Sequence, residues 1–117
     1  MNKEIEAETL EVVNRQLDAY NKRDYESFAS CYCSDIISFD LNTSEQILEM
    51  SGSNFFKHYS NKLQENPKIH CKVIERITCG NLVIDKELIS NFQGANHDEV
   101  VIYQVEEQLI SKMWFKR

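Results

Sequence analysis

The chain has 117 residues, 42% of them hydrophobic and 27% charged, which is enough for one domain over residues 1–117 to bury a core without metal or disulfide support. Its 19 acidic and 13 basic residues give a net charge of -6, and no basic cluster precedes Lys116 and Arg117, so we expect no nucleic-acid partner and no membrane partner. The lack of a signal-peptide core and of an apolar run of membrane-spanning length predicts a cytoplasmic protein.

The sequence lacks familiar metal and cofactor motifs. Its four cysteines, at positions 31, 33, 71 and 79, do not have the spacing of a zinc site, which favours reduced thiols packed in the interior. The three histidines are scattered, and no glycine-rich phosphate loop is present. We therefore expect no metal site and no cofactor.

The first part of the chain has helical periodicity. Apolar residues recur at intervals of three, four and three between Lys3 and Lys22, which predicts one amphipathic helix. Asp24 is a suitable N-cap for a short second helix, in which three aromatic residues share a face. These faces comprise Leu10, Val13, Leu17 and Tyr20 in the first helix and Tyr25, Phe28 and Tyr32 in the second.

A third helix is predicted to start at residues 51–53 and to extend to about Gln64, with Ser51 or Ser53 as its N-cap. Pro67 ends the pattern because proline disfavours a helical conformation at the preceding residue. The apolar face of this helix carries Phe55, Phe56, Tyr59 and Leu63.

The remaining segments have the composition of β-strands. Residues 36–41 form one such segment, and residues 46–50 are expected to pair back on it after a turn. The second half of the chain predicts an antiparallel meander, since short turns separate four long β-rich runs. These runs are Ile69–Cys79, Leu82–Phe92, Glu99–Glu106 and Leu109–Lys116. Strands of this length curl, and the helices would cover the concave face and leave a pocket beyond their reach.

Six segments of the chain carry a resemblance to a known family: Leu17–Asp24, Cys31–Asp35, Phe39–Leu41, Asn81–Glu87, Val101–Val105 and Leu109–Phe115. Together with the order of elements they resemble the nuclear-transport-factor-2-like (NTF2-like) superfamily, and within it the SnoaL-like and steroid delta-isomerase-like proteins. The resemblance covers nearly the whole chain and implies an α+β cone, with three N-terminal helices packed on a strongly curved, mostly antiparallel sheet. Because the superfamily contains isomerases, cyclases, dehydratases, hydrolases and proteins that only bind, the resemblance is more informative about fold than about activity.

Asp40 is the catalytic residue that the resemblance implies. In the steroid isomerases an aspartate at the end of this strand is the general base, and the interval from Tyr32 to Asp40 is similar. In those isomerases a tyrosine and an aspartic acid donate the hydrogen bonds that stabilise the enolate. Here Gln16 takes the place of the tyrosine and Val101 that of the aspartic acid. The alternative for Asp40 is a carboxylate that accepts hydrogen bonds from the amides of residues 42–44.

Further residues are candidates for ligand binding. Glu87 shares a strand face with Asp85, although both could instead be solvated or paired with Arg76 and Lys72. Tyr103 and Trp114 each combine an apolar body with one polar hydrogen, and their alternative is a place in the core or in a dimer interface. The inward faces of the helices add further candidates, so the ligand-binding set is Gln16, Tyr20, Phe56, Tyr59, Glu87, Tyr103 and Trp114.

The sequence thus predicts a protein that binds a small apolar or cyclic molecule in a cone-shaped pocket, with cofactor-free isomerase chemistry at Asp40 as its enzymatic form. Two alternatives remain: a ligand-binding module without catalysis, and a dimeric interaction domain whose cone is filled by side chains. We expect a homodimer that forms through the outer face of the meander.

Overall fold

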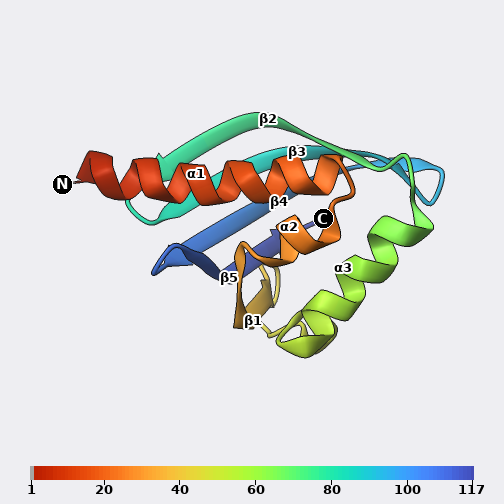
Figure 1. Cartoon of the computed structure of the whole chain (residues 1–117), viewed down its shortest axis with the longest axis horizontal. Coiled ribbons are helices and arrows are strands. Elements are labelled where there is room, and N and C mark those ends of the chain that lie inside the picture. Colours follow the sequence, from red (N-terminus) through yellow and green to blue (C-terminus); the bar gives the residue numbers. More distant parts are fainter. Residues whose placement is uncertain (1) are drawn as a thin grey trace.

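The computed structural model describes residues 2–117. Three helices lie on one side of a single five-stranded sheet, as Figure 1 shows. The elements are α1 (Asn2–Asn21), α2 (Tyr25–Ala29), β1 (Tyr32–Asp40), the short 3-10 helix η1 (Leu48–Met50), α3 (Ser53–Glu65), β2 (His70–Cys79), β3 (Leu82–Phe92), β4 (Ala95–Glu106) and β5 (Leu109–Lys116).

The sheet confirms the predicted meander. Its strand order is β1-β5-β4-β3-β2, and the four C-terminal strands pair antiparallel with their chain neighbours. β1 adds to the far edge by pairing parallel with β5, so the sheet is mostly antiparallel, as expected. A register shift in β2 between Val73 and Glu75 adds to the bend of the sheet over α1 (Figure 1). The predicted α+β cone is therefore the observed architecture.

The short helix α2 begins where the sequence predicts. The Asp24 carboxylate accepts a hydrogen bond from the Ser27 backbone N–H at 3.2 Å and another from the Ser27 hydroxyl at 2.7 Å. The helix ends at Ala29, however, so Tyr32 is the first residue of β1 and not part of the helical face. Its ring still packs against Phe28, with 4.9 Å between the centroids.

The predicted N-cap of α3 is wrong. Gly52, with φ of 55°, occupies the cap position, and no side chain bonds to the first turn. Ser51 has another role, because its hydroxyl donates to the Ile47 carbonyl at 2.8 Å and accepts from the Ser38 N–H at 3.0 Å. It thereby ties η1 to β1. The expected hairpin is reduced to one bridge between Phe39 and Gln46.

β4 is longer than predicted and begins at Ala95 instead of Glu99. The polar residues before Glu99 resemble a loop in sequence, but Phe92 pairs with Ala95 across a two-residue turn. Gln93 and Gly94 both have positive φ, at 53° and 75°, which is the backbone that a tight hairpin needs. The turn therefore lets the polar segment continue the ladder.

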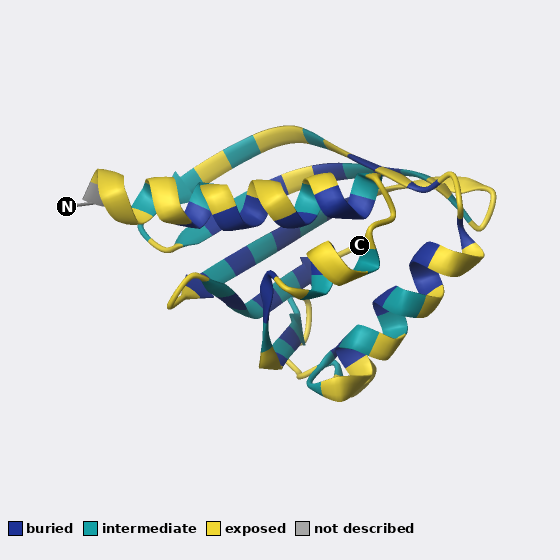
Figure 2. Cartoon of the chain, in the orientation of Figure 1, coloured by how far each residue is buried: buried dark blue, intermediate teal, exposed yellow. Residues whose placement is uncertain are grey.

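The core lies between the helices and the concave face of the sheet. Figure 2 shows the buried side of α1 turned toward the strands and its exposed side turned away. Aromatic rings from α2, β1 and α3 form the part of the core beneath the short helix, with centroids 4.6 to 5.1 Å apart. They belong to Phe28, Tyr32, Phe55 and Tyr59.

The cysteines are free thiols, and their burial differs from expectation at one position. Cys31 and Cys71 are buried and Cys33 is half-buried, whereas Cys79, at the end of β2, is exposed. The prediction of four packed thiols is therefore wrong for Cys79, whose partner across the ladder is Leu82 on the outer face. Within residues 2–117 no helix is long and apolar enough to cross a membrane.

An apolar row crosses the outer face of the sheet, opposite the helices. The strand registers align one residue from each of the five strands, and all five are half-buried or exposed. At one end the Phe39 and Trp114 rings stack at 5.5 Å, and at the other end Ile77 is 64% exposed. The row, which we call the outer row, consists of Phe39, Trp114, Ile102, Ile84 and Ile77.

We expect a second copy of the chain to cover the outer row, because a continuous apolar stripe on a sheet face is unfavourable in water. Wild-type protein should sediment as a dimer at micromolar concentration. Ile77→Lys combined with Ile84→Lys should shift it toward monomer, whereas Ile5→Lys, which changes an exposed residue of α1, should not. A monomeric wild-type protein would contradict this expectation.

Candidate functional site

A small cavity lies inside the cone, between the helices and the concave face of the sheet. Its volume is about 20 Å³, which is room for one water molecule. Its lining is unusually polar for a protein interior, since it includes an amide, four tyrosines, a lysine and a glutamate. The lining residues are Gln16, Leu17, Tyr20, Phe28, Tyr32, Tyr59, Lys62, Cys71, Ile89, Glu99, Tyr103, Met113 and Phe115.

A chain of buried hydrogen bonds crosses from the helices to the sheet along the wall of this cavity. The Tyr32 hydroxyl donates to Gln16 Oε1 at 2.7 Å, and Gln16 Nε2 donates to the Tyr103 hydroxyl oxygen at 3.3 Å. The Tyr103 hydroxyl in turn donates to Glu87 Oε2 at 2.9 Å. We call these four residues the buried chain. Every donor points toward Glu87, so the carboxyl group terminates the chain as an acceptor.

Glu87 is only 3% exposed, and this burial is the main cause of a raised pKa. The negative charges of Glu99 and Asp85 act in the same direction, while hydrogen bonds from Tyr103 and Cys71 act against it. The result is a pKa raised from its ordinary 4.5 to about 7. Glu87 can therefore gain or lose a proton near neutral pH.

Asp85, the other inward carboxylate of β3, is satisfied by a permanent partner. Arg76 Nε and Nη2 lie 2.6 and 2.8 Å from its two oxygens, and Arg76 Nη1 donates to Asn14 Oδ1 on α1 at 2.6 Å. This is the pairing anticipated as the alternative for Asp85. It fastens α1 to the sheet, and both oxygens of the buried Asp85 carboxylate are engaged by Arg76.

Two polar groups on the cavity wall have no partner among the described residues. The Tyr20 hydroxyl is buried and makes no hydrogen bond within residues 2–117, and burial raises its pKa. Lys62 is 7% exposed, and no ion pair joins its ammonium to a described carboxylate. A buried hydroxyl without a partner is rare in native proteins unless a water molecule, an ion or a ligand satisfies it.

Lys62 lies among aromatic rings. Its Nζ is 5.7 Å from the ring centroid of Tyr20, 5.2 Å from that of Tyr59 and 4.8 Å from that of Phe92. The ring faces compensate part of the lost hydration of the ammonium. Burial nevertheless lowers the pKa of Lys62 from 10.5 to about 8, which leaves it charged at neutral pH.

A second hollow, of about 150 Å³, lies at the open end of the cone, and we call it the mouth. It shares Lys62, Ile89 and Glu99 with the inner cavity, so the two spaces meet at these side chains. Glu99 is buried, and its Oε2 accepts a hydrogen bond from Arg117 Nε at 3.1 Å. The lining residues of the mouth are Lys62, Ile89, Phe92, His97, Glu99 and Arg117.

The structure brings most of the predicted ligand-binding residues together. Gln16, Tyr20, Tyr59 and Tyr103 line the inner cavity, and Glu87 joins them through its bond to Tyr103. They come from α1, α3, β3 and β4. Helical periodicity indicated Tyr20 and Tyr59, and strand alternation grouped Glu87 with Asp85. Gln16 followed from the resemblance and Tyr103 from its amphipathic side chain, and ligand binding by these five stays a prediction.

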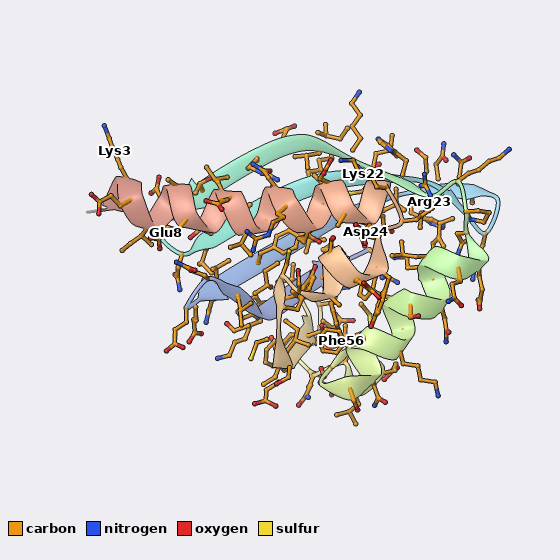
Figure 3. All side chains as sticks on the ribbon, viewed as in Figure 1. Lys3, Glu8, Lys22, Arg23, Asp24 and Phe56 are labelled. Atoms are coloured by element: carbon orange, nitrogen blue, oxygen red, sulfur yellow. The ribbon has the colours of Figure 1, made fainter. Side chains whose placement is uncertain are left out.

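Asp40, Phe56 and Trp114 do not line the inner cavity. Phe56, labelled in Figure 3, is half-buried on α3 and packs T-shaped against Phe55 at 5.3 Å. Trp114 belongs to the outer row, on the opposite face of the sheet, because it alternates with the inward residues Met113 and Phe115.

Asp40 lies at the end of β1 and lines a different surface hollow, of about 460 Å³. Its Oδ1 accepts from the backbone N–H of Asn42 at 2.7 Å and of Thr43 at 3.3 Å. This is the hydrogen bonding anticipated as the structural alternative to catalysis. Catalysis by Asp40 stays a prediction, and the geometry supplies no link between Asp40 and the buried chain.

Sequence reasoning missed Lys62, Glu99 and Cys71. Lys62 follows Phe55 and Tyr59 at helical intervals of four and three, so a lysine on an otherwise aromatic stripe was the available signal. Glu99 alternates with Val101 and Tyr103 on the inner face of β4. It stood at the first position of the predicted strand, where a carboxylate is usually solvated, and was not selected.

Replacing Glu87 with Gln should change how stability depends on pH. The folded protein holds the Glu87 proton more tightly than the unfolded chain, so its favourable contribution is complete below about pH 4.5 and is lost as the pH rises to about 7. Glu87→Gln cannot titrate and should become more stable than wild type across this range, by roughly 1 to 3 kcal/mol above pH 7. Urea unfolding at several pH values measures the difference.

The matched control is Glu75→Gln, which removes an exposed carboxylate from the neighbouring strand β2. Its stability should stay within about 0.5 kcal/mol of wild type across the same range. A Glu87→Gln variant whose stability advantage does not grow between pH 4.5 and 7 would contradict a raised pKa.

Replacing Asp40 with Ala should destabilise the protein by about 1 kcal/mol, because it removes the acceptor for the two loop amides. Asp35→Ala, at an exposed position of the same strand, should cost less than about 0.5 kcal/mol. Thermal melts compare the two variants. Unchanged stability of Asp40→Ala would argue against the loop role and in favour of a functional one.

No protein-family model matches the chain, and no curated protein matches its sequence. Solved structures do match. An uncharacterised cystatin-fold protein from Novosphingobium aromaticivorans superposes with a TM-score of 0.79 at 19% identity, over 93% of this chain and 97% of that one. A SnoaL-like protein of unknown function from Burkholderia thailandensis gives a TM-score of 0.72 at 13% identity, over 94% and 93% of the two chains.

A protein named as a candidate ketosteroid isomerase from Kribbella flavida gives a TM-score of 0.74 at 21% identity, over 93% of this chain and 76% of that one. Sequence identities this low establish the architecture and leave the activity open. The resemblance noted in the sequence is thereby confirmed at the level of the fold. The chain has the nuclear-transport-factor-2-like fold.

Proposed function

We propose that the protein binds a small, largely apolar or cyclic molecule in the cone, and that this molecule enters through the mouth. The observation that carries the proposal is a pair of unpartnered groups on one wall, the buried Tyr20 hydroxyl and the ammonium of Lys62, a residue that is only 7% exposed. A bound molecule would satisfy both groups. The alternative of an interaction domain with a filled cone leaves them unsatisfied.

The cost of leaving such groups unpaired supports this proposal. A buried donor or acceptor without a partner is unfavourable by roughly 1 to 3 kcal/mol, and more when it is charged. The inner cavity itself holds only one water, so a larger ligand must occupy the mouth, where Lys62, Ile89 and Glu99 face both spaces. Its inner end would then approach Tyr20, which lines the inner cavity.

Proton transfer is a second candidate function, and the buried chain favours it. Tyr103 lies on the cavity wall and is hydrogen-bonded to a carboxyl group whose pKa is about 7. General acids and bases work best when their pKa lies near the working pH. By this argument the Tyr103–Glu87 pair is better placed for chemistry in the cone than Asp40, whose oxygen is held by two loop amides.

The binding proposal is tested with a library of small cyclic compounds and amide NMR spectra of the full chain. Compounds that bind should shift signals of residues around the mouth and the inner cavity. Ile89→Phe should abolish these shifts because the added ring occupies the place where the two spaces meet. Leu88→Phe adds a ring to the outer face of the same strand, at a position outside the outer row, and should leave them unchanged.

A second, less disruptive variant tests the same site if Ile89→Phe fails to fold. Tyr20→Phe removes only the unpartnered hydroxyl, so the free protein should be at least as stable as wild type while affinity for bound compounds falls. Shifts that cluster around Asp40 instead of the mouth would contradict the proposed site. A library without any binder would contradict the proposed function.

A further inference from the structure

We infer that the ligand carries one carboxylate, or a comparable monoanionic group, and that this group binds the Lys62 ammonium in the mouth. The inference rests on the proposed function and specifies the chemical class of its ligand. It depends on the place of Lys62 in the fold, on the charges around the mouth and on the size of that hollow.

Lys62 is a largely buried residue whose ammonium has no paired anion. The residue is only 7% exposed, yet no described carboxylate forms an ion pair with it. Its Nζ lies 4.8 to 5.7 Å from three ring centroids, and rings compensate an ammonium less fully than an anion does. An ammonium can donate three hydrogen bonds, and a ligand carboxylate would accept them.

The nearby acidic residue does not fill this role. Glu99 faces the same hollow, but its Oε2 is bound to Arg117 Nε at 3.1 Å. The mouth is lined by two positive side chains, Lys62 and Arg117, and one negative side chain, Glu99. Its local charge is therefore +1, although the whole protein has a net charge of -6. Low-dielectric walls strengthen that local excess for an anion of matching size.

The same surroundings restrict the anion to a single charge. Glu99 at the mouth and Glu87 in the interior would repel a second negative group placed deeper in the cone. The body of the ligand would instead meet apolar surface from Ile89 and Phe92. The mouth measures about 150 Å³, below the roughly 300 Å³ of sites for drug-sized ligands, which favours a compact ring with one acidic group.

The test compares acids with their uncharged counterparts. The full chain is titrated at neutral pH with benzoate and cyclohexanecarboxylate, and separately with benzamide and cyclohexanecarboxamide, while amide NMR spectra report where each compound binds. The acids should shift signals around Lys62 and bind about tenfold or more tightly than the amides, because only the acids pair with the ammonium.

The decisive variant is Lys62→Met, which keeps an unbranched side chain, one atom shorter, and removes the charge. It should weaken binding of the acids about tenfold or more and leave binding of the amides within about twofold, which also shows that the site stays folded. Lys57→Met removes an exposed lysine from the same helix and should change neither affinity.

The outcomes separate the inference from the function on which it rests. Equal affinity for acids and amides at the mouth, or unchanged acid binding by Lys62→Met, would overturn the anion site while the proposed binding function stands. If neither kind of compound bound, and the wider library also gave no shifts, the proposed function itself would be overturned.

Discussion

The fold of this protein depends on polar side chains that must be satisfied inside a curved sheet. The concave faces of β3 and β4 carry Asp85, Glu87 and Tyr103 where a purely apolar core would carry aliphatic residues. Each of them therefore needs a hydrogen-bond partner at a fixed position, supplied by a neighbouring strand or by α1. Gln16 of α1 donates to Tyr103, and Tyr103 donates to Glu87. Arg76 of β2 pairs with Asp85 and also donates to Asn14 of α1. The register of α1 on the sheet is therefore set by hydrogen bonds as well as by packing.

The polar groups of the interior are fully paired at one end of β3 and incompletely paired at the other. Toward the start of β3, Asp85 and Arg76 form a complete ion pair with both carboxylate oxygens occupied. Toward the end of that strand the same face carries Glu87 and then Ile89, and the ammonium that approaches Ile89 from α3 has no anion. Complete pairing of the kind seen at Asp85 is typical of a structural polar network, and the unpaired ammonium at the other end is the feature on which the proposed ligand site rests.

The sequence predicts the fold of this protein better than it predicts the site. Periodicity within each element predicted the helices, the meander and the inward direction of Tyr20 and Tyr59, because these depend on local spacing. It could not give the depth at which a residue lies along the cone. Asp40 and Trp114 have suitable chemistry, but the loop amides engage the first and strand alternation turns the second to the outer face. Such outcomes follow from register and turn geometry, which local patterns specify weakly.

Lys62 illustrates why the missed residues are also the informative ones. A lysine on the buried stripe of a helix opposes the packing that forms the helix, since desolvating its charge lowers its pKa to about 8 and weakens the folded state. As the pH rises from about 8 to 10.5 the folded protein releases this proton before the unfolded chain does, so the penalty diminishes over that interval. A methionine there would pack without that penalty. A residue that lowers stability under neutral conditions, in a position where an apolar one would fit, is best explained by an interaction that the free protein does not make.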